Sequence, residues 1–333
     1  MIRLAIYLFL FFFSLNSGNE TNKVTIKNNK LHVNGEEYFI KGVCYDPVPI
    51  GKTKRNFEMI DVDLLLMQEA GINTIRVYSP IDDIEILNKI DDAGIKVIIN
   101  FGYNQNGFYD ILNNTYINYV IKYKDHNAIL FWELGNEYNF NSQWFNGNLE
   151  NWYSSMNYAA ENIKKIDINH PVSTAHGEIP SLKALKMGSK IDLWGINVYR
   201  WDNPTSIIDE WKKISNKPFY FSEIGSDSYM TATKDGFNKG ENQFAQAEAN
   251  KKIITSILNA SNDVSGLLIF QFVDGLWKAG NPNQQDIGGW APNSTGVPYD
   301  GTANEEFWGI VDINRNKKKT FEIIKKLYNE FKI

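Results

Sequence analysis

Two glutamates, each close to the end of a short apolar run, are the residues best placed to do chemistry. Glu137 lies near the end of the run 128–138 (AILFWELGNEY), and Glu223 near the end of 218–225 (PFYFSEIG). Runs of this kind are typical of buried parallel strands, which deliver their last side chains to one edge of a sheet. The pattern predicts two carboxyl groups at equivalent heights.

Paired carboxyl groups are what the cleavage of a glycosidic bond requires. One acid protonates the leaving oxygen, and a second carboxylate works from the other side of the anomeric carbon. In retaining enzymes the two groups lie about 5 to 5.5 Å apart, and in inverting enzymes about 6.5 to 9.5 Å. Strands four and seven of an eight-stranded barrel face each other obliquely, which suits the shorter distance. Either acid alone has an equally simple role as a capping or salt-bridging group.

The remaining chain supplies the elements that position this pair. Helical periods of apolar residues, several of them ended by Gly, alternate with short apolar runs. We count eight strands and eight helices, and therefore predict a single (β/α)8 TIM barrel with a short N-terminal β-hairpin. The alternative is a doubly wound open sheet, which gives no reason for two acids at strand ends. The predicted strands are 38–44, 73–78, 96–101, 128–138, 172–176, 191–199, 218–225 and 266–273.

The helices in this interpretation have less regular spacing than the strands. The clearest are 60–70, 81–93, 151–166, 206–214, 241–259 and 317–331, with a short piece before the sixth strand. The longest irregular stretch, 277–307, follows the eighth strand, and a loop of that length inside a compact domain is usually functional. We expect it to lie over the carboxyl ends of the strands.

Composition restricts the class of partner. The chain has 333 residues, 43% hydrophobic and 22% charged, which excludes general disorder. A net charge of −5 argues against nucleic acid, because phosphate binding needs a basic face. Aromatic residues make up 14%, and amphipathic rings are suited to stacking on sugars. We expect a neutral carbohydrate partner, such as a β-glucan or an oligosaccharide, although any single ring is as easily a core residue.

The N-terminus has the layout of a secretory signal. Arg3 precedes an apolar run of about a dozen residues and then small polar residues, and the run is short for a bilayer span. We predict a signal peptide over 1–18, a barrel domain over 19–333, and a secreted or periplasmic protein with no stable membrane anchor after cleavage. An uncleaved anchor is the alternative. Cys44 is the single cysteine, so no internal disulfide forms, and without a His/Cys cluster we expect no metal and no cofactor.

Several segments of the sequence resemble a known family of enzymes. The segments LGNE (134–137) and FSE (221–223), with FIKGVCYDP, EAGINTIRVYSP, DDAGIKVIINF and WGINVY, resemble the retaining glycosidases built on the (β/α)8 barrel. They are similar to the fungal-type β-1,3-glucanosyltransferases and to the barrel domain of the β-galactosidase and β-glucuronidase family. The former usually carry paired cysteines and a further domain, and the latter place β-sandwich domains before the barrel.

The resemblance implies roles for the acids and their neighbours. Glu137 becomes the general acid/base and Glu223 the nucleophile of a double displacement. Asn136 is implied to bind the sugar 2-hydroxyl, and Tyr199 to orient Glu223. Arg76 is implied to keep the nucleophile ionised, while its strand position also allows an ion pair with Glu133 inside the barrel.

Three further aromatic residues are implied to bind substrate. Trp277, just past the eighth strand, becomes the floor under the sugar at the cleavage point. Tyr45 and Tyr78 end the first two strands and are implied to line the sugar site, with rim packing as the alternative.

We therefore expect an exported retaining β-glycosidase. A transglycosylase on the same site is the alternative, because both reactions share the covalent intermediate. A carbohydrate-binding barrel without catalysis is a third possibility, and it predicts that one of the two acids is misplaced or buried.

Overall fold

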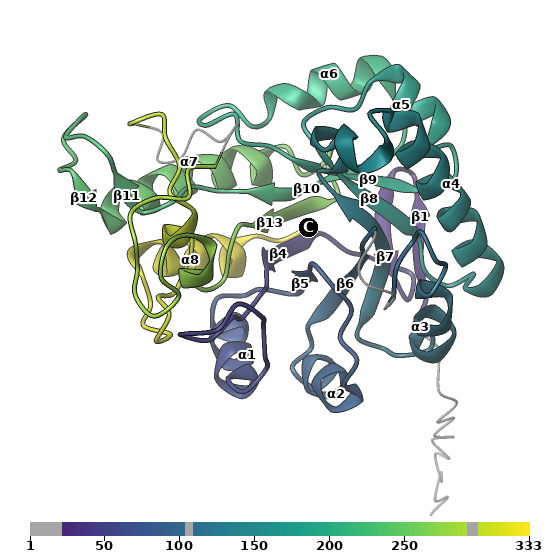
Figure 1. Ribbon diagram of the computed structural model, residues 1–333, viewed down its shortest axis with the longest axis horizontal. Coiled ribbons are helices and arrows are strands. Elements are labelled where there is room, and N and C mark those ends of the chain that lie inside the picture. The colour runs from purple at the N-terminus through teal and green to yellow at the C-terminus, as the bar shows by residue number, and fades with distance from the viewer. Residues whose placement is uncertain (1–21, 104–108, 292–298) are drawn as a thin grey trace, which may run out of the picture.

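A closed barrel of eight parallel strands forms the centre of the computed structural model, which describes residues 22–103, 109–291 and 299–333. The strands follow one another around the barrel in chain order, with β13 closing it between β10 and β4, and helices surround them (Figure 1). This confirms the predicted (β/α)8 barrel. Its strands are β4 (Ile40–Cys44), β5 (Thr74–Val77), β6 (Lys96–Phe101), β7 (Ile129–Asn136), β8 (Val172–Gly177), β9 (Leu193–Asn197), β10 (Phe219–Ile224) and β13 (Gly266–Ile269).

The N-terminal segment is slightly more elaborate than the predicted hairpin. Three antiparallel strands form a separate small sheet, because Asn34 and Gly35 make a second turn that adds a third, two-residue strand. These strands are β1 (Val24–Lys27), β2 (Lys30–Val33) and β3 (Glu36–Glu37). The predicted signal peptide, 1–18, lies outside the described residues.

Local sequence signals account for the helix boundaries. The Asp83 side chain accepts a hydrogen bond from the backbone of Glu85 and so begins its helix, and Asn148 does the same for a later one. Gly71 and Gly94, with φ of 73° and 70°, follow the first two helices in the left-handed conformation. The helices are α1 (Ile60–Glu69), α2 (Ile84–Asp92), α3 (Tyr116–Tyr123), α4 (Leu149–Ile166), α5 (Leu182–Met187), α6 (Ser206–Ile214), α7 (Gln243–Asn259) and α8 (Lys319–Glu330).

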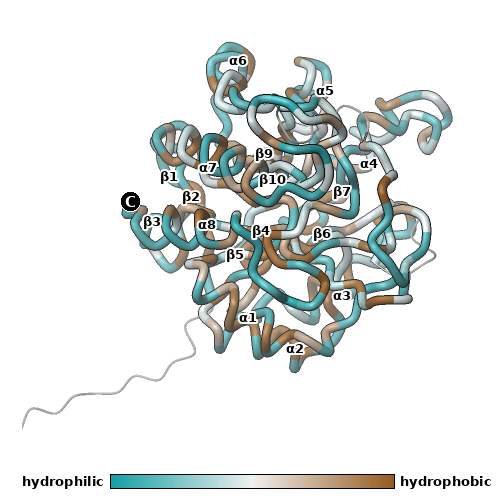
Figure 2. The backbone as a smooth tube through the Cα atoms, turned by 90° about the vertical axis from the view of Figure 1, so that its left-hand side faces the viewer, coloured by the Kyte–Doolittle hydropathy of each residue, from teal (hydrophilic) through white to brown (hydrophobic). Residues whose placement is uncertain are grey.

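The core lies in two places, between strands and helices and inside the barrel. Hydrophobic and hydrophilic segments alternate along the helices, as expected for amphipathic elements that cover a sheet (Figure 2). Inside the barrel, aliphatic side chains share the space with a buried polar layer that includes Arg76 and Glu133. Among the described residues, the helices are all too short or too polar to traverse a bilayer.

Candidate active site

A cavity of about 630 Å³ opens at the carboxyl ends of the barrel strands. Both predicted catalytic acids line it, since Glu137 directly follows β7, the fourth barrel strand, and Glu223 belongs to β10, the seventh. The structure thus brings together two acids that lie far apart in the sequence. The other lining residues are Asp46, Tyr78, Asn136, Phe140, Asn141, Glu178, Asn197, Tyr199, Phe270, Gln271, Trp277, Lys278, Ala291, Glu305 and Trp308.

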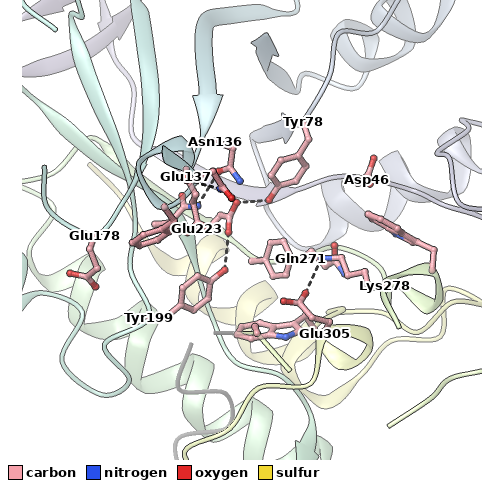
Figure 3. Close-up of a pocket in the computed structure, with 17 residues that line it drawn as sticks. Asp46, Tyr78, Asn136, Glu137, Glu178, Tyr199, Glu223, Gln271, Lys278 and Glu305 are labelled. Atoms are coloured by element: carbon pink, nitrogen blue, oxygen red, sulfur yellow. Dashed lines mark hydrogen bonds and ion pairs between the residues drawn. The ribbon is translucent and has the colours of Figure 1, made fainter. Parts of the chain in front are cut away.

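Three donors hold the Glu223 carboxylate. Arg76 Nη1 donates to Oε1 at 2.8 Å. The Tyr78 hydroxyl donates to the same oxygen at 2.7 Å, and the Tyr199 hydroxyl donates to Oε2 at 2.9 Å (Figure 3). The Glu223 side chain is only 7% exposed, so these bonds replace the water it has lost. Donors on both oxygens fix the plane and the orientation of the carboxylate.

Arg76 itself is fully buried and connects the cavity to the interior of the barrel. Its Nε donates to Glu133 at 2.7 Å, so the two pairings considered from sequence, with Glu133 and with Glu223, both occur. Burial alone would lower the Arg76 pKa, but the charges of Glu133, Tyr78 and Glu223 raise it well above its usual value. The guanidinium therefore stays charged.

Glu133 is satisfied on both oxygens. Oε1 accepts from Arg76 and from the Asn100 amide at 2.7 Å, and Oε2 accepts from the Tyr220 hydroxyl, which in turn contacts Ser173. The charge inside the barrel is tolerated because Arg76 neutralises it and both carboxylate oxygens accept hydrogen bonds. The network explains a residue whose inward position the sequence alone left without a function.

Glu137 stands in a different environment. Its backbone has φ of 53° and follows Gly135 at 70°, so the chain leaves β7 through a strained turn that is uncommon for a residue other than glycine. Burial and then the charge of Glu223 raise the Glu137 pKa to about 7, against the lowering effect of a hydrogen bond with Asn197. The two carboxyl groups of one cavity thus stand in different electrostatic environments.

The Asn136 amide is oriented from two sides. Its Oδ1 accepts from Arg76 Nη2 at 2.9 Å and from Asn197 Nδ2 at 3.0 Å, while Ser222 donates to Asn197 at 2.6 Å. Asn197 was not among the predicted site residues. The signal was present, because Asn197 lies two positions before Tyr199 and shares its side of the strand.

Tyr45 does not line the cavity, which corrects the prediction. The side chain is fully buried and its hydroxyl donates to Asp63 at 2.8 Å. Its ring packs against Phe57 and Phe272, between the barrel wall and α1. Cys44 contacts Ser222 and Arg76 inside the barrel, so the alternation of the strand directs the next residue, Tyr45, outward. Tyr78 lies two positions after the inward-facing Arg76 and faces the cavity.

Aromatic residues near Glu223 complete one wall. Trp277 lines the cavity at 36% exposure, as the sequence predicted for a residue past the eighth strand. Trp308, which was not predicted, contacts both Tyr199 and Phe270 edge-on, at 5.4 and 5.5 Å between ring centres. Trp308 Nε1 and Gln271 Nε2 are buried donors without a partner among the described residues.

The charged lining residues are distributed over two ends of the cavity. Glu178 lies on one side of the acid pair, and Asp46, Lys278 and Glu305 lie on the other (Figure 3). Lys278 and Glu305 form an ion pair at 3.3 Å, and both belong to the loop 277–307. The loop therefore reaches the site, as expected. Across the described ranges, no three His, Cys, Asp or Glu side chains converge in the manner of metal ligands.

Comparisons with known proteins place this geometry in context. No family model matches the chain. It is 25% identical over 243 residues to the 1,3-β-glucanosyltransferase GAS4 of Saccharomyces cerevisiae, covering 60% of this chain and 50% of that protein. It is 24% identical over 256 residues to the 1,3-β-glucanosyltransferase gel1 of Aspergillus fumigatus, covering 65% and 54%. The chain spans about half the length of these relatives.

Solved structures share the fold. A β-glucuronidase of Faecalibacterium prausnitzii superposes with a TM-score of 0.70 at 17% identity, over 93% of this chain and 52% of that one. A GH2 β-galacturonidase of Eisenbergiella tayi, bound to galacturonate, gives 0.66 at 20%, over 93% and 55%. The chain thus resembles the 1,3-β-glucanosyltransferases in sequence, and in fold it shares the barrel found in these GH2 glycosidases.

Proposed function

We propose that the chain is a retaining β-glycosidase that cleaves neutral β-linked glucan or oligosaccharide by double displacement. The observation that carries the proposal is the contrast between the two acids of one cavity. Glu223 is held by Arg76 and two tyrosine hydroxyls, which suits a nucleophile, and Glu137 has a pKa raised to about 7, which suits a proton donor. Two acids lining one cavity also argue against a barrel that only binds carbohydrate.

In the first half of the reaction, Glu223 attacks the anomeric carbon while Glu137 gives its proton to the glycosidic oxygen. Asn136, its Oδ1 fixed by two donors, has its Nδ2 available to donate to the sugar 2-hydroxyl. The Gln271 and Trp308 side chains line the same cavity.

In the second half, Glu137 becomes the base. Once Glu223 is esterified its negative charge is gone, and that charge is one cause of the raised Glu137 pKa. The Glu137 pKa therefore falls in the intermediate, which leaves a carboxylate ready to take a proton from water. Attack by water releases the sugar and regenerates Glu223.

The charges of the site favour a neutral sugar over a uronic acid. Lys278 is the one cation among the described residues that line the cavity, and it is already paired with Glu305. Arg76 is similarly committed to Glu133 and Glu223. A sugar carboxylate would thus enter a cavity of carboxylates without an uncommitted cation to receive it.

The second candidate is a transglycosylase on the same site, with a sugar hydroxyl in place of water. The similarity to the 1,3-β-glucanosyltransferases favours it. Because both reactions pass through the same intermediate, the residues around the acid pair decide between them rather than the acids themselves.

Chemical rescue tests the two assignments separately. On an activated aryl β-glycoside, Glu223→Ala should lose about three orders of magnitude in kcat or more, and added azide should restore turnover to give the α-glycosyl azide. Glu137→Ala with azide should instead give the β-glycosyl azide, because the covalent intermediate still forms. The same azide anomer from both variants would reject the proposed division of roles.

A further inference from the structure

The ring of Phe140 has no part in the mechanism proposed for the two acids and the side chains around Glu223. It belongs to the short turn η1 (Tyr138–Phe140), which begins directly after Glu137. The residue lines the cavity, yet it is 46% exposed, an unusual state for a large apolar side chain beside a buried site.

Gly177, the last residue of β8, provides the seat of this ring. A β-carbon at Gly177 would lie 2.1 Å from Phe140 Cε2, so the ring rests on the backbone where any other residue would displace it. One side of the ring is therefore covered by protein, while its exposure shows that much of the remainder is open.

The turn that carries the ring is fixed to the barrel. Asn139 Nδ2 donates to the Gly177 carbonyl at 2.9 Å, and the Gly177 amide donates back to Asn139 Oδ1 at 2.9 Å. The Phe140 amide donates to the Glu137 carbonyl at 3.0 Å, and the Glu137 backbone amide donates to the Ala175 carbonyl at 3.0 Å. The ring is thus held in a fixed relation to the acid/base.

The positions of the two acids relative to the glycosidic bond determine which sugar of the substrate can contact the Phe140 ring. The donor ring must lie against the nucleophile, which is surrounded by Tyr78, Tyr199 and, through Tyr199, Trp308. The acid/base reaches the glycosidic oxygen, so the leaving group extends past Glu137, away from that wall. Phe140 and Asn141 come just after Glu137, and Glu178 lies at the same end of the cavity (Figure 3).

We propose that Phe140, seated on Gly177, is the platform of a subsite for the leaving-group sugar and, after its departure, for an acceptor sugar. The ligand is a neutral pyranose, whose apolar face stacks on the ring. Glu178, half exposed and oriented by Arg200 at 2.6 Å, accepts hydrogen bonds from its hydroxyls. The subsite rests on the proposed glycosidase function, and it would favour transfer by holding an acceptor against the intermediate.

The test measures how the intermediate partitions. With 4-nitrophenyl β-laminaribioside as donor and laminaritetraose as acceptor, nitrophenol release counts every intermediate formed, and mass spectrometry counts transfer products. The ratio of transfer to hydrolysis is independent of how fast the intermediate forms. A variant that is merely less well folded changes the total rate but not this ratio.

Two variants disturb the platform in different ways. Phe140→Ala removes the ring and Gly177→Ala displaces it, and each should lower the ratio about fivefold to tenfold. Phe140→Trp should restore most of it, because a larger ring still stacks. Tyr158→Ala removes an aromatic ring of similar exposure, 57%, from the outer face of α4; this matched control should leave the ratio unchanged.

If the wild type forms no transfer product, the same variants are compared on laminarihexaose and on the aryl glycoside. The loss in kcat/KM should then be selectively larger for laminarihexaose, whose leaving sugar needs the platform. The subsite alone would be overturned if the wild type is active and Phe140→Ala changes neither the ratio of transfer to hydrolysis nor the relative kcat/KM for laminarihexaose. A wild type that releases no nitrophenol and cleaves no laminarihexaose would overturn both the subsite and β-glucan cleavage.

Discussion

Arg76 donates a hydrogen bond to Glu223 at 2.8 Å from a site in the barrel wall that solvent does not reach. The same guanidinium neutralises Glu133, so a group that serves the cavity also balances a charge in the core. Catalysis and stability are therefore joined in one side chain, and substitutions can separate them.

Arg76→Met should destabilise the protein by about 3–5 kcal/mol, because Glu133 is left as an unpaired buried charge. Combining it with Glu133→Gln should recover at least half of that loss in urea unfolding, since the charge is gone. Activity should stay low in both, as Glu223 still lacks its cation. Equal stability of the single and double variants would argue against the shared role.

The pH dependence should report Glu137. Its pKa, raised to about 7 by burial and by the charge of Glu223, belongs to a group that must be protonated in the first step. The kcat/KM profile of the free enzyme should therefore fall as the pH rises through about 7. A profile that remains flat from pH 5 to 9 would exclude Glu137 as the proton donor.

The same group affects stability with a definite sign. Its folded pKa of about 7 lies above the ordinary 4.5, so its favourable contribution is present below about pH 4.5 and is lost as the pH rises through 7. At pH 8 the free energy of unfolding of Glu137→Gln should thus exceed that of the wild type by up to about 3 kcal/mol. The difference should shrink between pH 7 and pH 4.5, and a constant difference would contradict the linkage.

Tyr78→Phe should isolate the value of one donor to the nucleophile. The substitution removes the hydroxyl at 2.7 Å from Glu223 but keeps the ring, which lies 4.7 Å from the Arg76 guanidinium. We expect kcat to fall about tenfold to a hundredfold with little change in the thermal midpoint. Trapping with a 2-deoxy-2-fluoro glycoside should slow in parallel. Unchanged trapping would mean that Tyr78 does not act on the first step.

Tyr45→Phe should have the opposite profile. Its hydroxyl serves Asp63, which also receives two hydrogen bonds from Arg315, at 2.9 and 3.1 Å. We expect a loss of about 1 kcal/mol in unfolding free energy and a kcat/KM within about twofold of the wild type. A large loss of activity with full stability would restore Tyr45 to the substrate site.

The enzyme should strongly prefer a neutral sugar over one that carries a carboxylate. With Lys278 engaged by Glu305, an aryl β-glucuronide should react at least about a hundredfold more slowly, in kcat/KM, than the matching β-glucoside. Glu305→Gln, which frees Lys278, should narrow the difference. Preference for the glucuronide in the wild type would show that the cavity admits anionic sugars.

The sequence was sufficient for the residues that end strands. Arg76 and Glu223 lie within strands, whereas Tyr78, Glu137 and Tyr199 lie one or two residues past strand ends. All five reach the cavity because parallel strands deliver their last residues to one edge of the barrel. Apolar runs and glycine stops located these strand ends to within a few residues, so the acid pair followed from the pattern. The predicted leader, 1–18, remains a prediction.

Residues outside the strands were harder to place. Tyr45 was assigned to the wrong side because the alternation of the first barrel strand was not applied to it: Cys44 faces the interior of the barrel, so the next residue faces outward. Phe140 and Trp308 lie in turns whose paths depend on tertiary contacts, such as the bond between Asn139 and Gly177. Alternation along β9 would have identified Asn197, and it was overlooked in favour of Tyr199.

The polar layer around Glu133 restricts how this barrel can change. Filling it with aliphatic side chains is an obvious route to a more heat-resistant protein, because a buried ion pair is often no better than well-packed hydrophobic residues. Here that route removes the anchor that aims Arg76 at Glu223. Substitutions intended to raise thermal stability are therefore better placed in the helices and in the small N-terminal sheet, where they leave the residues around Glu223 unchanged.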